Sequence, residues 1–215
     1  MTATLVQAPD LAERLDRGLN DLGVPLPGEA RAKLLGFLAL IGKWNQVYNL
    51  TAIRDGSHMV SVHLLDCLAI APHIAGPRLL DVGSGAGLPG IPLAVAKPDI
   101  EVTLLDSSHK KAAFLRQAAA ELQLDNVSVV CERVENWRPT VRFNCIVSRA
   151  YAELAEFVSS SSHLLAPDGI FASMKGLHPF EEIDRLPGNF LISKVIRLEV
   201  PTLAAERHLV LIRPA

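Results

Sequence analysis

The feature that most constrains this chain is an apolar strand that runs directly into a glycine-rich turn and then into a helix. Residues 79–90 read Leu-Leu-Asp-Val-Gly-Ser-Gly-Ala-Gly-Leu-Pro-Gly. Glycine permits positive φ and leaves room for a ligand beside the backbone, and amides at the start of a helix have no partner within it. We therefore expect a ligand-binding loop around Gly83, Gly85 and Gly87, with free amide donors at the start of the helix that follows. The alternative is a turn that only packs the helix on the strand.

The residues around this loop alternate between short apolar runs and amphipathic stretches, a pattern typical of a parallel α/β sheet. We expect strands at 78–82, 101–106, 127–131, 143–148 and 169–175, and helices at 88–96, 109–122, 154–165 and 179–185. Segments 190–200 and 207–213 also read as strands, and the short link 201–206 can join only antiparallel neighbours. The prediction is a mostly parallel sheet that ends in an antiparallel hairpin.

The first part of the chain has a helical rather than an alternating pattern. Apolar residues recur at helical spacing over 11–22, 29–47 and 56–74, which predicts three helices. We therefore divide the chain into an N-terminal helical extension, 1–75, and an α/β domain, 76–215.

Composition excludes several classes of protein. The 21 Lys and Arg residues against 23 Asp and Glu residues give a net charge of -2, which argues against binding nucleic acid through bulk positive charge. Cys67, Cys131 and Cys145 are widely spaced and form no Cys-x-x-Cys, so we expect reduced thiols and no metal site. The chain begins without a secretory signal pattern and contains no apolar run of about 18 residues. We expect a cytoplasmic protein that binds neither metal nor membrane.

Asp106 lies at the end of the second predicted strand, 23 residues after Gly83. A carboxylate there can accept hydrogen bonds from both hydroxyls of a ribose. The alternative role is the N-cap of the following helix. NAD and S-adenosylmethionine both carry that ribose, and Gly85, Gly87 and Gly90 also fit the loose Gly-x-Gly-x-x-Gly pattern of dinucleotide enzymes. The residues alone leave both cofactors open.

Two features resemble class I S-adenosylmethionine-dependent methyltransferases, which have a Rossmann-like fold. The sequence Asp81-x-Gly83-x-Gly85-x-Gly87 resembles their motif I, and the predicted terminal hairpin matches their architecture. A dinucleotide-binding sheet is expected to keep alternating with helices instead. Both features favour S-adenosylmethionine as the cofactor.

Several strings resemble one family along nearly the whole chain. They are WNQVYNLT at 44–51, HLLD at 63–66, the loop ending GLPGIPL at 87–93, RVE at 133–135, SRA at 148–150 and MKG at 174–176. In this order and spacing they resemble the bacterial 16S ribosomal RNA guanine-N7 methyltransferases, once called glucose-inhibited division protein B. The resemblance implies methyl transfer from S-adenosylmethionine to N7 of guanine 527. The implied partner is 16S rRNA, the small ribosomal subunit or an assembly intermediate.

The resemblance also implies roles for individual residues around the cofactor. Gly83 and Leu88 would line its methionine and ribose side, and Ser84 would complete the glycine loop. Val134 and Glu135 would approach the adenine. From the residues alone, Glu135 is equally well read as an exposed carboxylate at a helix start.

Arg149 would face the reaction centre, where the resemblance implies that it contacts the cofactor and positions the guanine. It follows an apolar strand, so its guanidinium is expected at the carboxyl edge of the sheet, where α/β sheets bind ligands, although a structural salt bridge is the alternative. Lys175 ends the next strand and is read either as a phosphate or base contact or as a solvated lysine. Asn144 replaces an aspartate often found in the family, which leaves one polar contact open.

The chemistry implied by this resemblance needs no general base, because guanine N7 carries a lone pair and no proton. Cys145 lies inside an apolar strand and is expected to be a buried residue rather than a nucleophile. Two other functions remain open: an NAD-dependent oxidoreductase, and a non-catalytic assembly factor that binds S-adenosylmethionine and RNA.

Overall fold

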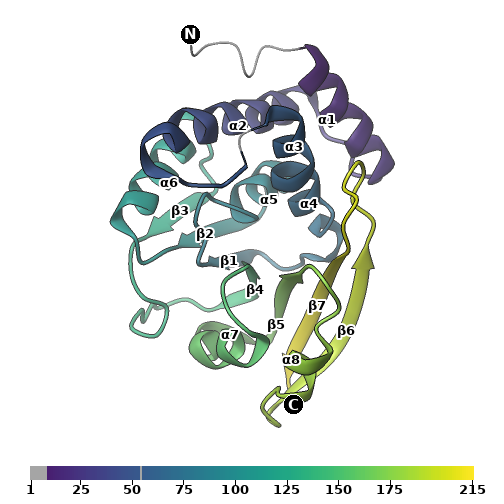
Figure 1. Cartoon of the computed structure of the whole chain (residues 1–215). Helices are drawn as coiled ribbons and strands as arrows, with labels where there is room; N and C mark the ends of the chain where they lie inside the picture. Colours follow the sequence, from purple (N-terminus) through teal and green to yellow (C-terminus); the bar gives the residue numbers. More distant parts are fainter. Residues whose placement is uncertain (1–8, 54) are drawn as a thin grey trace.

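The computed structural model describes residues 9–53 and 55–215 and contains a seven-stranded sheet (Figure 1). The strands are β1 (Arg78–Val82), β2 (Glu101–Leu105), β3 (Val127–Val130), β4 (Phe143–Arg149), β5 (Leu165–Lys175), β6 (Phe190–Leu198) and β7 (Arg207–Pro214). The α-helices are α1 (Pro9–Asp21), α2 (Gly28–Tyr48), α3 (Gly56–Met59), α4 (Asp66–Leu68), α5 (Gly90–Ala96), α6 (His109–Glu121), α7 (Leu154–Ser161) and α8 (Phe180–Asp184). A π-helical segment, η1 (Val60–Leu65), and two 3-10 turns, η2 (Ala71–His73) and η3 (Ser162–Leu164), complete them. No helix in the described ranges is long and apolar enough to cross a membrane.

The strand order is β3-β2-β1-β4-β5-β7-β6. Strands β1 to β5 are parallel, and β7 pairs antiparallel with both β5 and β6. This confirms the predicted parallel sheet and its antiparallel hairpin, which stands at one edge of the molecule (Figure 1). The chain leaves β1 toward β2 on one side and later returns to β4 on the other. That reversal opens a crevice at the carboxyl ends of the strands, where open α/β sheets bind their ligands.

Alternating side chains of the strands divide the core between the two faces of the sheet. In β1, Leu79 joins the cluster packed against α1, α2, α5 and α6, whereas Leu80 joins the cluster packed against α7. Figure 1 shows α7 on the opposite side of the sheet from α5 and α6. The period of two in strand side chains produces this division.

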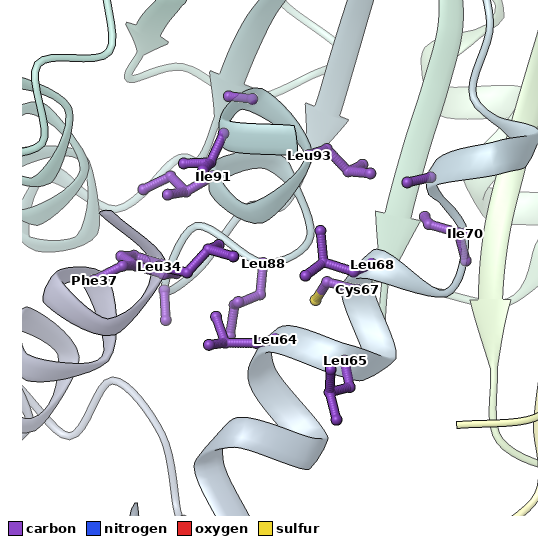
Figure 2. Packing of buried hydrophobic residues seen from close by; sticks show 14 of the residues in the cluster. Leu34, Phe37, Leu64, Leu65, Cys67, Leu68, Ile70, Leu88, Ile91 and Leu93 are labelled. Carbon is purple, nitrogen blue, oxygen red and sulfur yellow. The ribbon is translucent and has the colours of Figure 1, made fainter. Parts of the chain in front are cut away.

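The N-terminal helices pack directly on the helices that follow the glycine loop. Leu34 and Phe37 of α2 face Leu64 of η1 and Leu88 of the loop (Figure 2). The Phe114 ring of α6 is fully buried, with its centroid 6.4 Å from that of Phe37 and 5.4 Å from that of Trp44. One continuous cluster therefore crosses residue 75, and the division of the chain there stays a prediction.

The turn after α2 is held by side-chain hydrogen bonds. The side-chain amide of Asn45 donates from Nδ2 to Thr51 O at 2.8 Å, and Thr51 N donates to Asn45 Oδ1 at 2.9 Å. Asn49 caps α2 in the left-handed conformation, with φ 48°, and Thr51 Oγ1 lies 3.1 Å from Nε2 of the buried His63. These contacts fix η1 against the end of α2.

Apart from shifts of one or two residues at the ends of elements, the structure differs from the predicted elements in four places. The helix expected over 154–165 is α7, which ends at Ser161 and is followed by the 3-10 turn η3. The single helix expected over 56–74 is four segments, because the chain passes through the π-helical η1 and because Pro72 has no amide to continue an α-helix. Helix α5 begins at Gly90 rather than at Leu88, whose amide still closes the loop on Ser84 O. Strand β5 begins at Leu165, before the expected 169, with a register shift opposite the start of β4.

Candidate active site at the carboxyl edge of the sheet

The three glycines of the loop adopt backbone conformations that other residues rarely take. Gly83, Gly85 and Gly87 have φ values of 69°, 58° and 82°. A Cβ on Gly83 would lie 2.6 Å from Cδ2 of Tyr151, and one on Gly87 would lie 2.7 Å from Cδ1 of Ile91. The positive φ therefore favours glycine at all three positions, and the neighbouring side chains leave little room for a Cβ at Gly83 and Gly87.

The amides of the loop are occupied within the protein. Gly83 N and Ser84 N donate to Leu105 O at 2.8 and 3.1 Å, and Gly87 N and Leu88 N donate to Ser84 O at 2.7 and 3.1 Å. The expectation of free donors at the helix start is wrong for Leu88 N and also for Gly90 N, which donates to Asp81 Oδ2 at 2.9 Å. The hydrogen bonds hold the shape of the loop instead.

Asp106 is the residue that ties this loop to the start of α6. It is 6% exposed, and its two oxygens accept from Gly85 N at 2.9 Å and from Ser108 N at 2.8 Å. The N-cap of α6 is Ser108, so the alternative N-cap role for Asp106 is wrong. Lys111 Nζ also lies 3.6 Å from Oδ2. A carboxylate has about four acceptor positions, so these contacts still leave capacity for ribose hydroxyls.

A pocket of about 400 Å³ opens beside Asp106 at the carboxyl ends of β1 and β2. Four of the predicted residues line it: Gly83, Asp106, Val134 and Glu135. Tyr151 lines the same pocket and stands over Gly83.

The remaining predicted loop residues do not line this pocket. Ser84 is buried, and its hydroxyl donates to Asp81 O at 2.8 Å. Leu88 is buried in the core beneath α2 (Figure 2). Gly85 N donates to Asp106 and Gly87 N donates to Ser84 O, so both residues help to fix the shape of the loop. Contact of these four residues with a cofactor stays a prediction.

Sequence reasoning missed Tyr151. It follows Ala150, whose φ of 56° turns the chain back toward the glycine loop at the end of β4. Burial raises the pKa of the Tyr151 phenol. Its hydroxyl therefore stays protonated at neutral pH and remains a hydrogen-bond donor. The only sequence signal was its position two residues after a strand end.

Arg149 points away from the pocket and into the N-terminal helices. Its Nη1 donates to Val62 O at 2.8 Å and lies 3.5 Å from Oδ2 of Asp66. Asp66 also accepts from Nε of Arg207 at 3.1 Å. Burial raises the pKa of Asp66, and the two arginines oppose that shift. The structural salt bridge that was the alternative role for Arg149 is therefore present. Contact of Arg149 with the substrate or the cofactor stays a prediction.

Asp81 is fully buried beneath the loop. Its Oδ2 accepts from Gly90 N at 2.9 Å, whereas Oδ1 has no partner among the described residues. Burial raises the pKa of Asp81 to about 7, partly offset by the Gly90 hydrogen bond and by Arg149. The carboxyl group therefore changes charge near neutral pH.

The contacts of Cys145 and Asn144 lie within the sheet. Cys145 is fully buried, and burial raises its pKa to about 12, as expected for a residue that is not a nucleophile. Asn144 Oδ1 accepts a hydrogen bond from Arg78 N at 3.2 Å, which joins β4 to the start of β1.

The pocket fits a nucleoside carrying a sulfonium. A buried carboxylate with spare acceptor capacity suits the ribose, and the apolar Val134 suits the face of a purine. The close approach of Tyr151 to Gly83 leaves no room for a Cβ between loop and ring. The pocket lining carries four carboxylates, Asp106, Glu132, Glu135 and Glu156, against the two cations Lys111 and Arg133, and this excess of negative charge complements a cation.

Comparison with known proteins decides the family. Residues 30–210 match the model of the family described as "GidB: rRNA small subunit methyltransferase G". The chain belongs to this family. Two relatives named ribosomal RNA small subunit methyltransferase G support the assignment. The one from Chromobacterium violaceum is 54% identical, covering 91% of this chain and 94% of the relative. The one from Laribacter hongkongensis is 52% identical, covering 94% of this chain and 97% of the relative.

Solved structures agree on the fold of this GidB-family chain. A SAM-dependent methyltransferase from Thiobacillus denitrificans in complex with S-adenosyl-L-homocysteine has a TM-score of 0.53 at 10% identity, covering 70% of this chain and 91% of that one. The predicted class I methyltransferase fold is thereby confirmed. The family assignment also confirms an S-adenosylmethionine-dependent rRNA methyltransferase. An NAD-dependent oxidoreductase is therefore excluded.

Proposed function

We propose that this chain transfers a methyl group to N7 of guanine 527 in 16S rRNA, in the cytoplasm, on the small subunit or one of its assembly intermediates. The observation that carries this proposal is the pocket beside Asp106, formed at the carboxyl edge of the sheet in a chain of the GidB family.

The residues that line the pocket suggest how the cofactor is held. Asp106 would accept the ribose hydroxyls with the acceptor positions that Gly85 and Ser108 leave free. Val134 would pack on the adenine, and Glu135 would accept from its amino group. Gly83 and Tyr151 would enclose the sulfonium end, with the phenol as a donor.

The chemistry requires positioning rather than proton removal. Bound S-adenosylmethionine supplies an electrophilic methyl group, and guanine N7 offers a lone pair without first losing a proton. The protein therefore has to orient the guanine and exclude water, and such positioning can lower a barrier by several kcal/mol. Burial raises the pKa values of Cys67 and Cys145 to about 12, which suits a reaction without a thiolate nucleophile.

A methyl-transfer assay tests this proposal. Radiolabelled S-adenosylmethionine is incubated with the protein and with small subunits from cells that lack this methyltransferase, and the rRNA is digested to nucleosides. We expect the label in 7-methylguanosine. Cofactor binding without transfer would support the non-catalytic assembly factor, and label in another nucleoside would refute the proposed atom.

A further inference from the structure

One wall of the cofactor pocket comes from the chain that follows β4. Ala150, Tyr151 and Glu156 all line the pocket, and all three follow the end of that strand. Ala150 turns the chain with a φ of 56°, and Tyr151 then lies over Gly83, where its ring leaves no room for a Cβ. The shape of the pocket therefore depends on how the segment 150–154 is held.

Lys175 holds this segment from the neighbouring strand. It ends β5, its side chain is only 16% exposed, and its ammonium donates to Ala152 O at 3.0 Å and to Glu182 at 2.7 Å. The solvated lysine that was one alternative is therefore excluded, and contact of Lys175 with phosphate or base stays a prediction. Met174, the residue before it, is paired in register with the last residue of β4. The end of β5 thus fixes the chain on both sides of Tyr151.

Glu182 completes the attachment. It lies in α8, which packs beside α7 (Figure 1), and its Oε2 accepts from Lys175 and, at 2.8 Å, from Leu154 N at the start of α7. Its side chain is only 23% exposed, so solvent screens this charge-assisted pair less than a surface ion pair. Arg185 and Glu153 join the same elements at 3.8 Å, but both side chains are 61% exposed, and such a pair contributes little.

We propose that Lys175 and Glu182 are positioning residues for the cofactor. They act on S-adenosylmethionine through Tyr151, because they hold the segment in which Ala150 has its positive φ and so keep the phenol ring over Gly83. A residue other than glycine rarely takes a positive φ, and it keeps that conformation where the surrounding contacts fix the backbone. This inference rests on the place proposed for Tyr151 beside the sulfonium end of the cofactor, and it does not depend on which guanine is methylated.

Calorimetric titration of the full-length protein with S-adenosylmethionine, without RNA, tests the inference. We expect Lys175→Met to weaken cofactor binding about tenfold, the effect of losing roughly 1.4 kcal/mol. Lys33→Met is the matched control and should bind the cofactor as the wild type does. Lys33 Nζ lies 3.1 Å from Glu29 and donates to Gln123 O at 3.4 Å, a similar pair of contacts, and none of these residues lines the pocket.

A double-mutant cycle separates positioning from a general loss of structure. Tyr151→Ala should itself weaken cofactor binding about tenfold or more, because it removes the group through which Lys175 acts. Adding Lys175→Met to Tyr151→Ala should then cause no further loss, whereas two independent structural effects would add. Glu182→Ala takes the place of Lys175→Met in the same cycle if the latter does not fold.

Three results would overturn the inference. Lys175→Met binds the cofactor as tightly as Lys33→Met, Tyr151→Ala binds it as tightly as the wild type, or the loss caused by Lys175→Met persists in full when Tyr151 is already alanine. The proposed function fails separately, when the wild-type protein binds S-adenosylmethionine but transfers no methyl group to the small subunits.

Discussion

Asp106→Asn is the substitution that most directly tests how the cofactor site is built. The variant keeps the shape of the side chain and removes its charge. In the structure both carboxylate oxygens accept from backbone amides, those of Gly85 and Ser108. An asparagine has one acceptor oxygen and an amide group that donates. One of the two backbone amides must therefore lose its partner.

The size of the effect follows from these contacts. A buried amide without a partner costs about 1–3 kcal/mol, and we expect the free energy of unfolding to fall by that amount. Loss of a charged acceptor for the ribose hydroxyls removes about 1.5–3 kcal/mol more from the complex. Affinity for S-adenosylmethionine should therefore fall roughly tenfold to a hundredfold.

Calorimetric titration with S-adenosylmethionine measures the affinity, and denaturant unfolding measures the stability. Asp125→Asn is the control, because Asp125 is exposed and its side chain makes no hydrogen bond with the described residues. The reasoning is refuted if Asp106→Asn binds the cofactor as tightly as Asp125→Asn does.

Three further predictions concern the core, a buried acid and the edge of the sheet. Phe114→Ala should lower the free energy of unfolding by about 3–5 kcal/mol, because it empties the space between the Phe37 and Trp44 rings; a loss below about 1 kcal/mol in denaturant unfolding would contradict this. Burial raises the pKa of Asp81 from 3.8 to about 7, so its proton favours the folded state at low pH and this stabilisation is lost as pH rises through about 7. Unfolding of the wild type and of Asp81→Asn from pH 4 to 8 should show the wild type losing stability relative to the variant, by at most about 1.4 kcal/mol per pH unit, and parallel curves would show that Asp81 does not titrate there. Arg149→Ala should lower methyl transfer to subunits at least about tenfold while cofactor affinity, measured by calorimetry, is retained, and unchanged transfer would remove its positioning role.

The sheet could be predicted because its signals are local. Strand β1 has the predicted bounds, since an apolar run followed by glycines marks both its burial and its end. The need for Gly83 and Gly87 was likewise readable, because positive φ favours that residue type. The hairpin followed from the short link expected over 201–206, and in the structure the link between β6 and β7 covers 199–206.

The contacts across the sheet edge could not be predicted in this way. Asp66 and Arg207 are 141 residues apart, and no local pattern joins them. Tyr151 enters the pocket because Ala150 adopts a positive φ, which alanine gives no reason to expect. The amides at the helix start were expected to be free, but the Gly90 amide is bound by the side chain of the buried Asp81.

Mapping the methylated position tests the central claim most directly. Small subunits that lack the modification are incubated with the protein and S-adenosylmethionine, the rRNA is cleaved chemically at 7-methylguanosine, and the fragments are sized by primer extension. The account predicts one new cleavage, at guanine 527 of 16S rRNA, that depends on the cofactor and is weakened by Asp106→Asn. Cleavage at another guanine, or methyl incorporation without any cleavage, would contradict it.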